Sequence, residues 1–259
     1  MFDFIPSFKP FESLLRYLAQ YGFWSDFVTL CSSIKGVTGP VLFKIAEATD
    51  DTIYMIFLSG FYGILMGLPL GIMLYITRKG NILENSIIHS VLSFVTNVFR
   101  SIPFIILIVW IQPFTMNIME FITGKGTYLG REGAIIPLSI GVAPLIAKMI
   151  ENALLDLPKG LIEAARSMGA TPLQIIYKVL LPESLPVIVN SMTISLITLT
   201  GYIAMAGVVG AGGLGDLAKR YGYEGHNYDM MNIILIILVI IVFIIQFIGN
   251  KIVKRVSHQ

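Results

Sequence analysis

One short string in this sequence has the form of a nucleotide-binding motif. Residues Gly210 to Gly215 read GAGGLG, which matches the GxGxxG fingerprint of dinucleotide-binding proteins. That fingerprint needs a strand before it, a helix after it and an acidic residue near the end of the next strand. Here the string follows a long uncharged stretch instead. We therefore interpret residues 210–215 as a flexible outer turn between membrane helices, and we expect no NAD site there.

The other residue types that commonly do chemistry are sparse and scattered. The sequence contains no GxxxxGKS or GxxxxGKT string, so any ATP must be bound by another polypeptide, and we expect no cofactor in this chain. A single cysteine, Cys31, excludes an intramolecular disulfide. His89, His226 and His258 lie too far apart for metal-ligand spacing. Because an enzyme needs a grouped nucleophile, base and electrophile, this distribution argues against a membrane enzyme.

A transport pathway requires less reactive groups, and three residues are candidates for one. Arg100, Tyr202 and Met205 are charged, polar or polarizable side chains inside otherwise apolar stretches. A charged residue in a membrane span is costly and often functional, whereas one at the interface is routine anchoring, and both readings stay open for Arg100. The serines and threonines near Tyr202 have a simpler explanation, because they commonly bond their own helix backbone.

Composition indicates the medium in which these residues lie. Residues of the hydrophobic types make up 55% of the 259 residues, only 13% are charged, and the mean hydropathy is +0.79. That leaves too little polar surface to cover a soluble globule, so we expect a polytopic, all-α membrane protein. The net charge of +2 is small and the basic residues are scattered, which excludes a nucleic-acid surface.

Charge-free stretches locate the expected membrane helices, because a crossing needs about 20 mostly apolar residues. Within one of them, Ser86–Met119, the sequence predicts a break at Arg100–Pro103. Either a helix lies along the interface up to Phe99 and the crossing follows from Ser101, or one long helix points Arg100 into the bundle. The five predicted crossings are Thr52–Thr77, the Ser86–Met119 region, Gly133–Leu155, Ser184–Ala206 and Met230–Asn250.

Residues 1–48 are predicted to form an N-terminal extension, and residues 49–259 the transmembrane domain. Phe11, Leu14, Leu15 and Leu18 have helical spacing, which favours an amphipathic helix lying in the membrane interface. The alternative is a sixth crossing, which the charged residues of this segment disfavour. The start of the chain lacks the basic and apolar regions of a cleaved signal peptide.

Small residues recur along the first predicted crossing. Ser59, Gly63, Gly67 and Gly71 are spaced four residues apart, which would let a neighbouring helix approach closely. The pattern does not say whether that neighbour belongs to the same chain or to a second copy.

The segment between the third and fourth crossings, residues 156–182, is predicted to form a rigid two-helix elbow. Pro158 opens the first helix, and Gly169 is placed to end it in the left-handed conformation. Thr171 and Gln174 form the pattern of a capping box around Pro172, and a second break is expected at Pro182. A structured elbow outside the membrane suggests a docking element, although an ordinary helical hairpin has a similar composition.

This elbow resembles the signature loop of ABC importer permeases. Glu163, Ala164 and Ala165, three residues, Gly169, nine residues, Val179, one residue and then Leu181 and Pro182 match that signature with Val179 in place of isoleucine. The resemblance implies that the loop is cytoplasmic and couples to an ATPase subunit through Glu163, Ala164, Ala165, Gly169, Leu181 and Pro182.

Two further stretches, residues 97–107 and 201–215, resemble the methionine importer branch of that family. The resemblance implies a type I permease that forms a homodimer, binds two ATPase subunits, which hold ATP and Mg, and receives its solute from an extracytoplasmic binding protein. It implies methionine, in the D or L form, as the solute, while another small polar solute, or a secondary transporter or channel, remains the alternative.

The resemblance also implies an orientation in the bacterial inner membrane, with the N-terminus outside and the C-terminus cytoplasmic. Basic residues in the loops agree with this orientation. The numbers of basic residues on the two sides become equal when the basic residues of the N-terminal tail are counted as outside.

Overall fold

The structure is a computed structural model that describes residues 39–124 and 126–257. Every regular element among these residues is helical, which confirms the predicted all-α class. The predicted amphipathic helix from Phe11 to Leu18 lies outside the described residues, as does most of the predicted N-terminal extension. The main helices are α3 (Gly39–Thr77), α4 (Ser86–Ser101), α5 (Phe104–Trp110), α6 (Gln112–Thr123), α7 (Gly130–Leu155), α10 (Leu181–Ala206) and α12 (Tyr228–Val256).

Four helices are long and apolar enough to cross a membrane, and a bent pair makes a fifth candidate. α3, α7, α10 and α12 contain the four crossings that the sequence predicted between charges. α3 begins at Gly39, so it passes through the domain boundary that the sequence placed at residue 48. Its 39 residues extend about 58 Å at about 1.5 Å per residue, roughly twice the hydrocarbon thickness.

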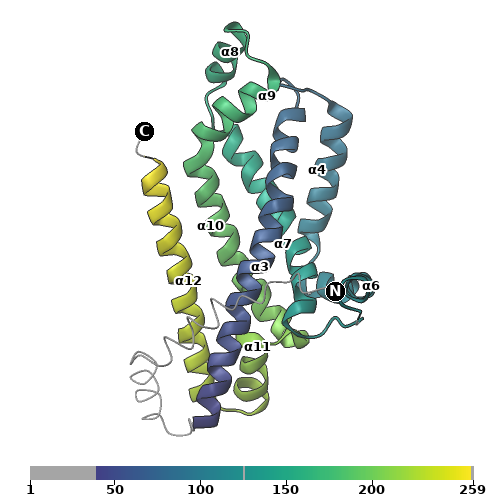
Figure 1. Ribbon diagram of the computed structural model, residues 1–259, viewed down its shortest axis with the longest axis vertical. Helices are drawn as coiled ribbons and strands as arrows, with labels where there is room; N and C mark the ends of the chain where they lie inside the picture. Colours follow the sequence, from purple (N-terminus) through teal and green to yellow (C-terminus); the bar gives the residue numbers. More distant parts are fainter. Residues whose placement is uncertain (1–38, 125, 258–259) are drawn as a thin grey trace.

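The bent pair is α4 and α5, whose axes differ by 102° across Ile102 and Pro103. The predicted break is therefore confirmed, but neither of the two helix arrangements predicted around it is observed. α4 runs beside α3 and α7 instead of lying apart from the bundle (Figure 1). The residues after the break form two short helices, α5 and α6, instead of one crossing. Pro103 has no N–H and forces Ile102 into an extended conformation, which turns the chain sharply.

The small residues of α3 pack against α7 of the same chain, which resolves the question left open by the sequence. A Cβ on Gly67 would lie 2.8 Å from the backbone oxygen of Ala143, and one on Gly71 would lie 2.5 Å from that of Ala147. These separations are too short for a side chain, so the glycines let the two helices pack backbone to backbone. α3 and α7 thus form the central pair of the bundle.

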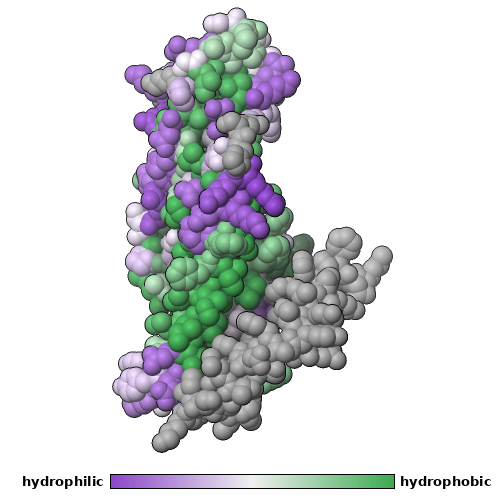
Figure 2. Space-filling view, turned by 90° about the vertical axis from the view of Figure 1, so that its left-hand side faces the viewer, coloured by the Kyte–Doolittle hydropathy of each residue, from purple (hydrophilic) through white to green (hydrophobic). Residues whose placement is uncertain are grey.

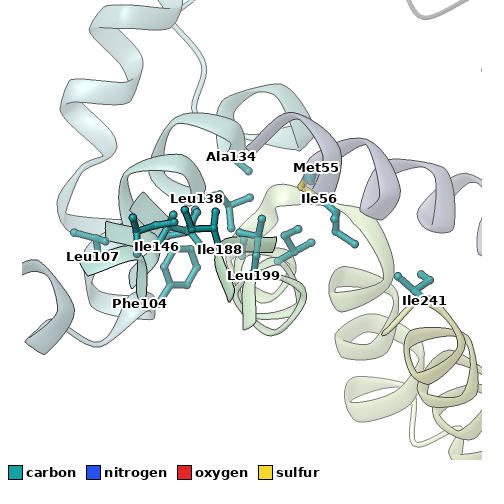
Figure 3. Close-up of a cluster of buried hydrophobic side chains, with 14 of the residues drawn as sticks. Met55, Ile56, Phe104, Leu107, Ala134, Leu138, Ile146, Ile188, Leu199 and Ile241 are labelled. Carbon is teal, nitrogen blue, oxygen red and sulfur yellow. The ribbon is translucent and has the colours of Figure 1, made fainter. Parts of the chain in front are cut away.

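The hydrophobic core surrounds this pair. Leu138 and Ile146 of α7 lie beside Phe104 of α5, and Leu199 of α10 lies on the other side toward Met55 of α3 (Figure 3). On the outside of the bundle, α12 packs along α10. Figure 2 shows hydrophobic residues gathered over the lower half of one face, with polar residues above them and at its foot.

The glycine-rich run after α10 is a tightly packed turn, so the expectation of a flexible turn was wrong. The chain leaves α10 through η2 (Gly207–Ala211), reverses, and continues through α11 (Gly213–Leu217) and η3 (Ala218–Glu224). A Cβ on Gly207 would lie 2.5 Å from the backbone nitrogen of Asp216, and one on Gly215 would collide with the backbone of Ala204. The glycines therefore allow two backbone segments to touch.

This outer turn is also tied to the first long helix. Leu214 is fully buried, and its backbone N–H donates a hydrogen bond of 2.9 Å to the hydroxyl of Thr52 on α3. Gly213 has a φ of +72° and lies directly beside the same hydroxyl. Tertiary contacts, which sequence periodicity does not report, hold this segment in place.

Candidate functional site

The elbow stands beyond the end of the helical bundle (Figure 1). Its first helix, α8 (Lys159–Ser167), follows Pro158, and its second, α9 (Pro172–Ile175), follows Thr171. The elbow and the end of α12 lie toward the same end of the molecule, while α3 begins at the opposite end.

Gly169 ends α8 as the sequence predicted. Its φ is +80°, in the left-handed region where a Cβ is penalised. The N–H of Gly169 donates to the Arg166 carbonyl at 2.9 Å, and the N–H of Ala170 donates to the Ala165 carbonyl at 3.1 Å. Nothing lies within 4 Å of a Cβ placed on Gly169, so the requirement for glycine comes from the backbone alone.

The predicted capping box at the start of α9 is present. The N–H of Gln174 donates to the Thr171 hydroxyl at 3.4 Å, and the N–H of Thr171 donates to the Gln174 side chain at 2.9 Å. Two backbone donors that the helix cannot satisfy are thereby paired. The angle between the two elbow helices is thus fixed by local bonds on both sides of Gly169.

The predicted break at Pro182 is wrong. α9 runs through the π-helical turn η1 (Ile176–Leu180) directly into α10, with the N–H of Leu181 donating to the carbonyl of Ile176. Pro182 lies in the first turn of α10, where its missing N–H costs little. The wider π-helical turn takes the place of a break, so the elbow is continuous with a membrane helix.

The signature residues divide into a buried and an exposed set. Ala165 is buried with Ile162 and Ile175, which holds the two elbow helices together. Glu163 and Ala164 are exposed, as is Pro182, and Leu181 is half-buried. Three large apolar side chains also point outward on the elbow: Met168, Leu173 and Tyr177. Reasoning from the sequence missed these three, although solvent-exposed apolar residues on a helix outside the bundle are a signal for a partner surface.

Arg166, also missed, connects the elbow to the loop between α3 and α4. Its guanidinium donates to the backbone oxygen of Asn81 at 3.2 Å, and the Asn81 side chain donates to the Tyr75 carbonyl at 2.6 Å. The elbow therefore has a polar link to the end of α3 in addition to its direct continuation into α10.

A buried carboxylate lies just inside this end of the bundle. Glu151 of α7 is 2% exposed, with Lys148 Nζ at 2.7 Å and Arg78 Nη1 at 4.0 Å. Lys148 and Glu151 are three residues apart, which places both side chains on one face of α7. Arg78 adds a connection to the end of α3, so this cluster joins the two central helices where the elbow begins.

The pathway candidates separate into two groups. Arg100 and Tyr202 line one open cavity of about 220 Å³, whose walls come from α4, α5, α7 and α10. The Tyr202 ring stacks on Phe104, with centroids 4.5 Å apart and planes 3° apart. Met205 does not line this cavity and is 47% exposed. The other residues lining the cavity are Phe99, Ile102, Leu107, Gly141 and Leu145.

Met205 belongs instead to an exposed stripe along α10. The stripe has helical spacing and mixes apolar with small and polar side chains, so it differs from a surface made only for lipid. Its members are Glu183, Val187, Asn190, Ile194, Gly201 and Met205.

Residues 67–258 match the family of binding-protein-dependent transport system inner membrane components. The chain belongs to this family. The match covers the elbow, the cavity and the stripe, and it identifies the chain as an inner-membrane transport subunit and not as an enzyme.

Two individual relatives are more than half identical to this chain over the matched residues. The D-methionine transport system permease protein MetI of Yersinia pestis is 55% identical over 219 residues, which cover 85% of this chain and 98% of the relative. The corresponding Escherichia coli K12 protein is 53% identical over 168 residues, covering 65% of this chain and 75% of the relative.

Solved structures show the same arrangement of helices. A chain of the MetNI methionine ABC transporter in inward-facing conformation superposes with a TM-score of 0.81 at 51% identity, covering 86% of this chain and 100% of the other. An amino acid ABC transporter solved with histidines has a TM-score of 0.66 at 21% identity and shows likeness of fold alone.

Proposed function

We propose that this chain is the permease subunit of an ATP-driven importer of methionine. The observation that carries the proposal is the elbow, whose two helices are fixed around Gly169 and whose second helix continues into α10. A push on the exposed side of such an elbow moves a membrane helix directly, because no flexible joint intervenes. The similarity to proteins named D-methionine permeases supports the choice of solute.

The ATPase partner is inferred from the elbow surface. Met168, Leu173 and Tyr177 are more than 60% exposed on the elbow. Burying them against a partner removes apolar surface from water, and Glu163 and Ala164 lie on the same elbow. Two ATPase subunits, one for each elbow of a homodimer, bind the ATP and Mg that this chain does not bind.

A second copy of the chain covers the exposed stripe of α10. Asn190 and Gly201 are poorly suited to lipid, since one has a polar amide and the other offers almost no apolar surface. The facing stripes of two copies enclose a path in which Met205 contributes a polarizable thioether. Solute reaches this path from a binding protein on the side of the membrane where α3 begins, and the elbow and C-terminus are cytoplasmic.

The proposal is tested with vesicles that contain this chain and its ATPase, with the binding protein and labelled methionine supplied on the extracytoplasmic side. We expect uptake that requires ATP hydrolysis and that unlabelled D- or L-methionine abolishes. If unrelated polar solutes compete and methionine does not, the transported solute is another small polar compound. Uptake without nucleotide would favour a channel or secondary transporter.

A further inference from the structure

We propose that the cavity beside Arg100 binds the carboxylate of the transported amino acid partway through the membrane. This inference rests on the proposed function, because it names the part of the solute that the permease holds. It adds a binding site within the permease to that function.

The charge in this cavity is isolated. Arg100 is the only Asp, Glu, Lys or Arg residue between Glu84 and Glu120. No described residue forms an ion pair with it, whereas Arg78, Arg131 and Arg220 each lie within 4.0 Å of a carboxylate. A guanidinium inside a membrane span is costly, and the protein leaves its charge available.

Arg100 is exposed, and it lies at the wall of the cavity near the middle of the bent pair. It lies about 20 Å along α4 from Ser86, at about 1.5 Å per residue, and directly before the bend at Pro103. The bend turns α5 across the end of α4, so that Phe104 and Leu107 form one wall of the cavity. The bent pair therefore produces the cavity that Arg100 lines.

Size and chemistry match a small amino acid. The cavity, at about 220 Å³, is smaller than the ~300–1,000 Å³ pockets that hold drug-sized ligands. A guanidinium pairs with a carboxylate through two parallel hydrogen bonds, which a neutral group cannot reproduce. The stacked rings of Phe104 and Tyr202 offer aromatic edges, with which a thioether makes favourable contacts.

Gly141 keeps the cavity open at the α7 wall. A Cβ at this position would lie 3.0 Å from the Phe104 ring and 3.4 Å from Leu107. A residue with a side chain at this position would require the Phe104 ring, which lines the cavity, to shift. The site thus has residues from four helices, and movement of α10 by the elbow shifts Tyr202 relative to Arg100.

The test uses a thiol placed in the cavity wall. Leu145→Cys in a Cys31→Ser background leaves one thiol in each permease copy of the full complex with its ATPase. An anionic methanethiosulfonate reagent is compared with a cationic one, because a cleft of one charge raises the local concentration of the opposite charge by about 10-fold or more. We expect the anionic reagent to react about tenfold faster, and methionine, but not methioninamide, to slow it.

Matched variants assign the effect to Arg100. Arg100→Gln is expected to abolish the preference for the anionic reagent, while Arg100→Lys retains it. Lys254→Met, which removes an exposed cation on α12, is expected to leave it unchanged. A preference that survives Arg100→Gln, equal protection by methioninamide, or a thiol that reacts with neither reagent would overturn the inference.

Two additional readouts separate the sources of failure. Labelling is repeated in vesicles of phosphatidylcholine with and without phosphatidylglycerol, and protection by the anionic lipid in place of methionine would show a lipid site and overturn the inference. Uptake by the unmodified complex reports the proposed function independently. Methionine uptake without charge preference refutes only the carboxylate site, whereas absent methionine uptake refutes the proposed function.

Discussion

The elbow at one end of the bundle and the glycine-rich turn at the other end both depend on glycine, for opposite reasons. Gly169 is needed because its φ is +80°, with open space around the missing Cβ. Gly215 is needed because the backbone of Ala204 occupies the place where a Cβ would be. The elbow is specified by local backbone geometry and left exposed for a partner, while the outer turn is specified by tertiary packing and buried.

The largest effect is expected in the outer turn. Gly215→Val places a branched side chain against the Ala204 backbone, and because backbone cannot move aside as a side chain does, we expect a loss of more than about 3 kcal/mol of stability. The measurement is the thermal unfolding midpoint of the purified chain in detergent, with abundance in the membrane. Gly160→Ala, where nothing lies within 4 Å of the added Cβ and which is outside the stripe on α10, is the control. Normal abundance and midpoint for Gly215→Val would show that the turn is loosely packed after all.

At the elbow, Gly169→Val is expected to reduce transport strongly while the bundle stays folded. The left-handed conformation costs a residue with a Cβ about 1–2 kcal/mol, and that cost changes the angle between α8 and α9. We expect methionine uptake to fall at least about tenfold, a change equivalent to about 1.4 kcal/mol, at unchanged abundance. Uptake and ATP hydrolysis are measured together in vesicles.

Gly160→Ala is the matched control on the same elbow. Gly160 lies inside α8 with no atom within 4 Å of the methyl group that alanine would add, so alanine is tolerated and favours the helix. Loss of uptake in both variants would mean that the elbow tolerates no added side chain, and the role of the Gly169 backbone would be disproved.

A smaller effect is expected from the buried carboxylate near the elbow. Glu151→Gln removes the charge that Lys148 and Arg78 share, and because both cations are partly exposed and can reach water, we expect a loss of only about 1–2 kcal/mol. Thermal unfolding midpoints at low and high salt measure it. If the variant is as stable as the parent at both salt concentrations, this cluster does not join α3 to α7.

The smallest effect is expected at the start of α9. Thr171→Ala removes one half of the capping box, and we expect a loss of about 1 kcal/mol with a modest decrease in uptake. Thr171→Ser retains the hydroxyl and should behave as the parent in the same uptake assay. A larger loss for serine than for alanine would contradict the assigned role of the hydroxyl.

The sequence predicted best those features that neighbouring residues determine. The end of α8 at Gly169, the cap at Thr171 and the four long apolar helices each follow from local bonding or from hydropathy. The same local rules failed at Pro182, because the helix continues into α10 through the π-helical turn that precedes the proline. They identified the break at Pro103 but not the direction of the bend, which depends on how α5 packs against α7 and α10.

Features that join distant residues were not predictable in this way. Sequence spacing showed the small-residue face of α3, and only the structure identified α7 as its neighbour. Arg100 and Tyr202 were separate candidates about a hundred positions apart, and the bend at Pro103 brings both to one cavity. The glycine-rich turn looked flexible because its contacts with Thr52 and Ala204 are remote in sequence.

The central claim is that the elbow is cytoplasmic and binds an ATPase partner, and thiol labelling tests it most directly. Met168 is 81% exposed on the elbow, and Met168→Cys in a Cys31→Ser background offers a single thiol. We predict that a membrane-impermeant maleimide labels it in inverted vesicles and not in intact cells, and that bound ATPase protects it. Labelling from outside, or equal labelling with and without the ATPase, would contradict the account.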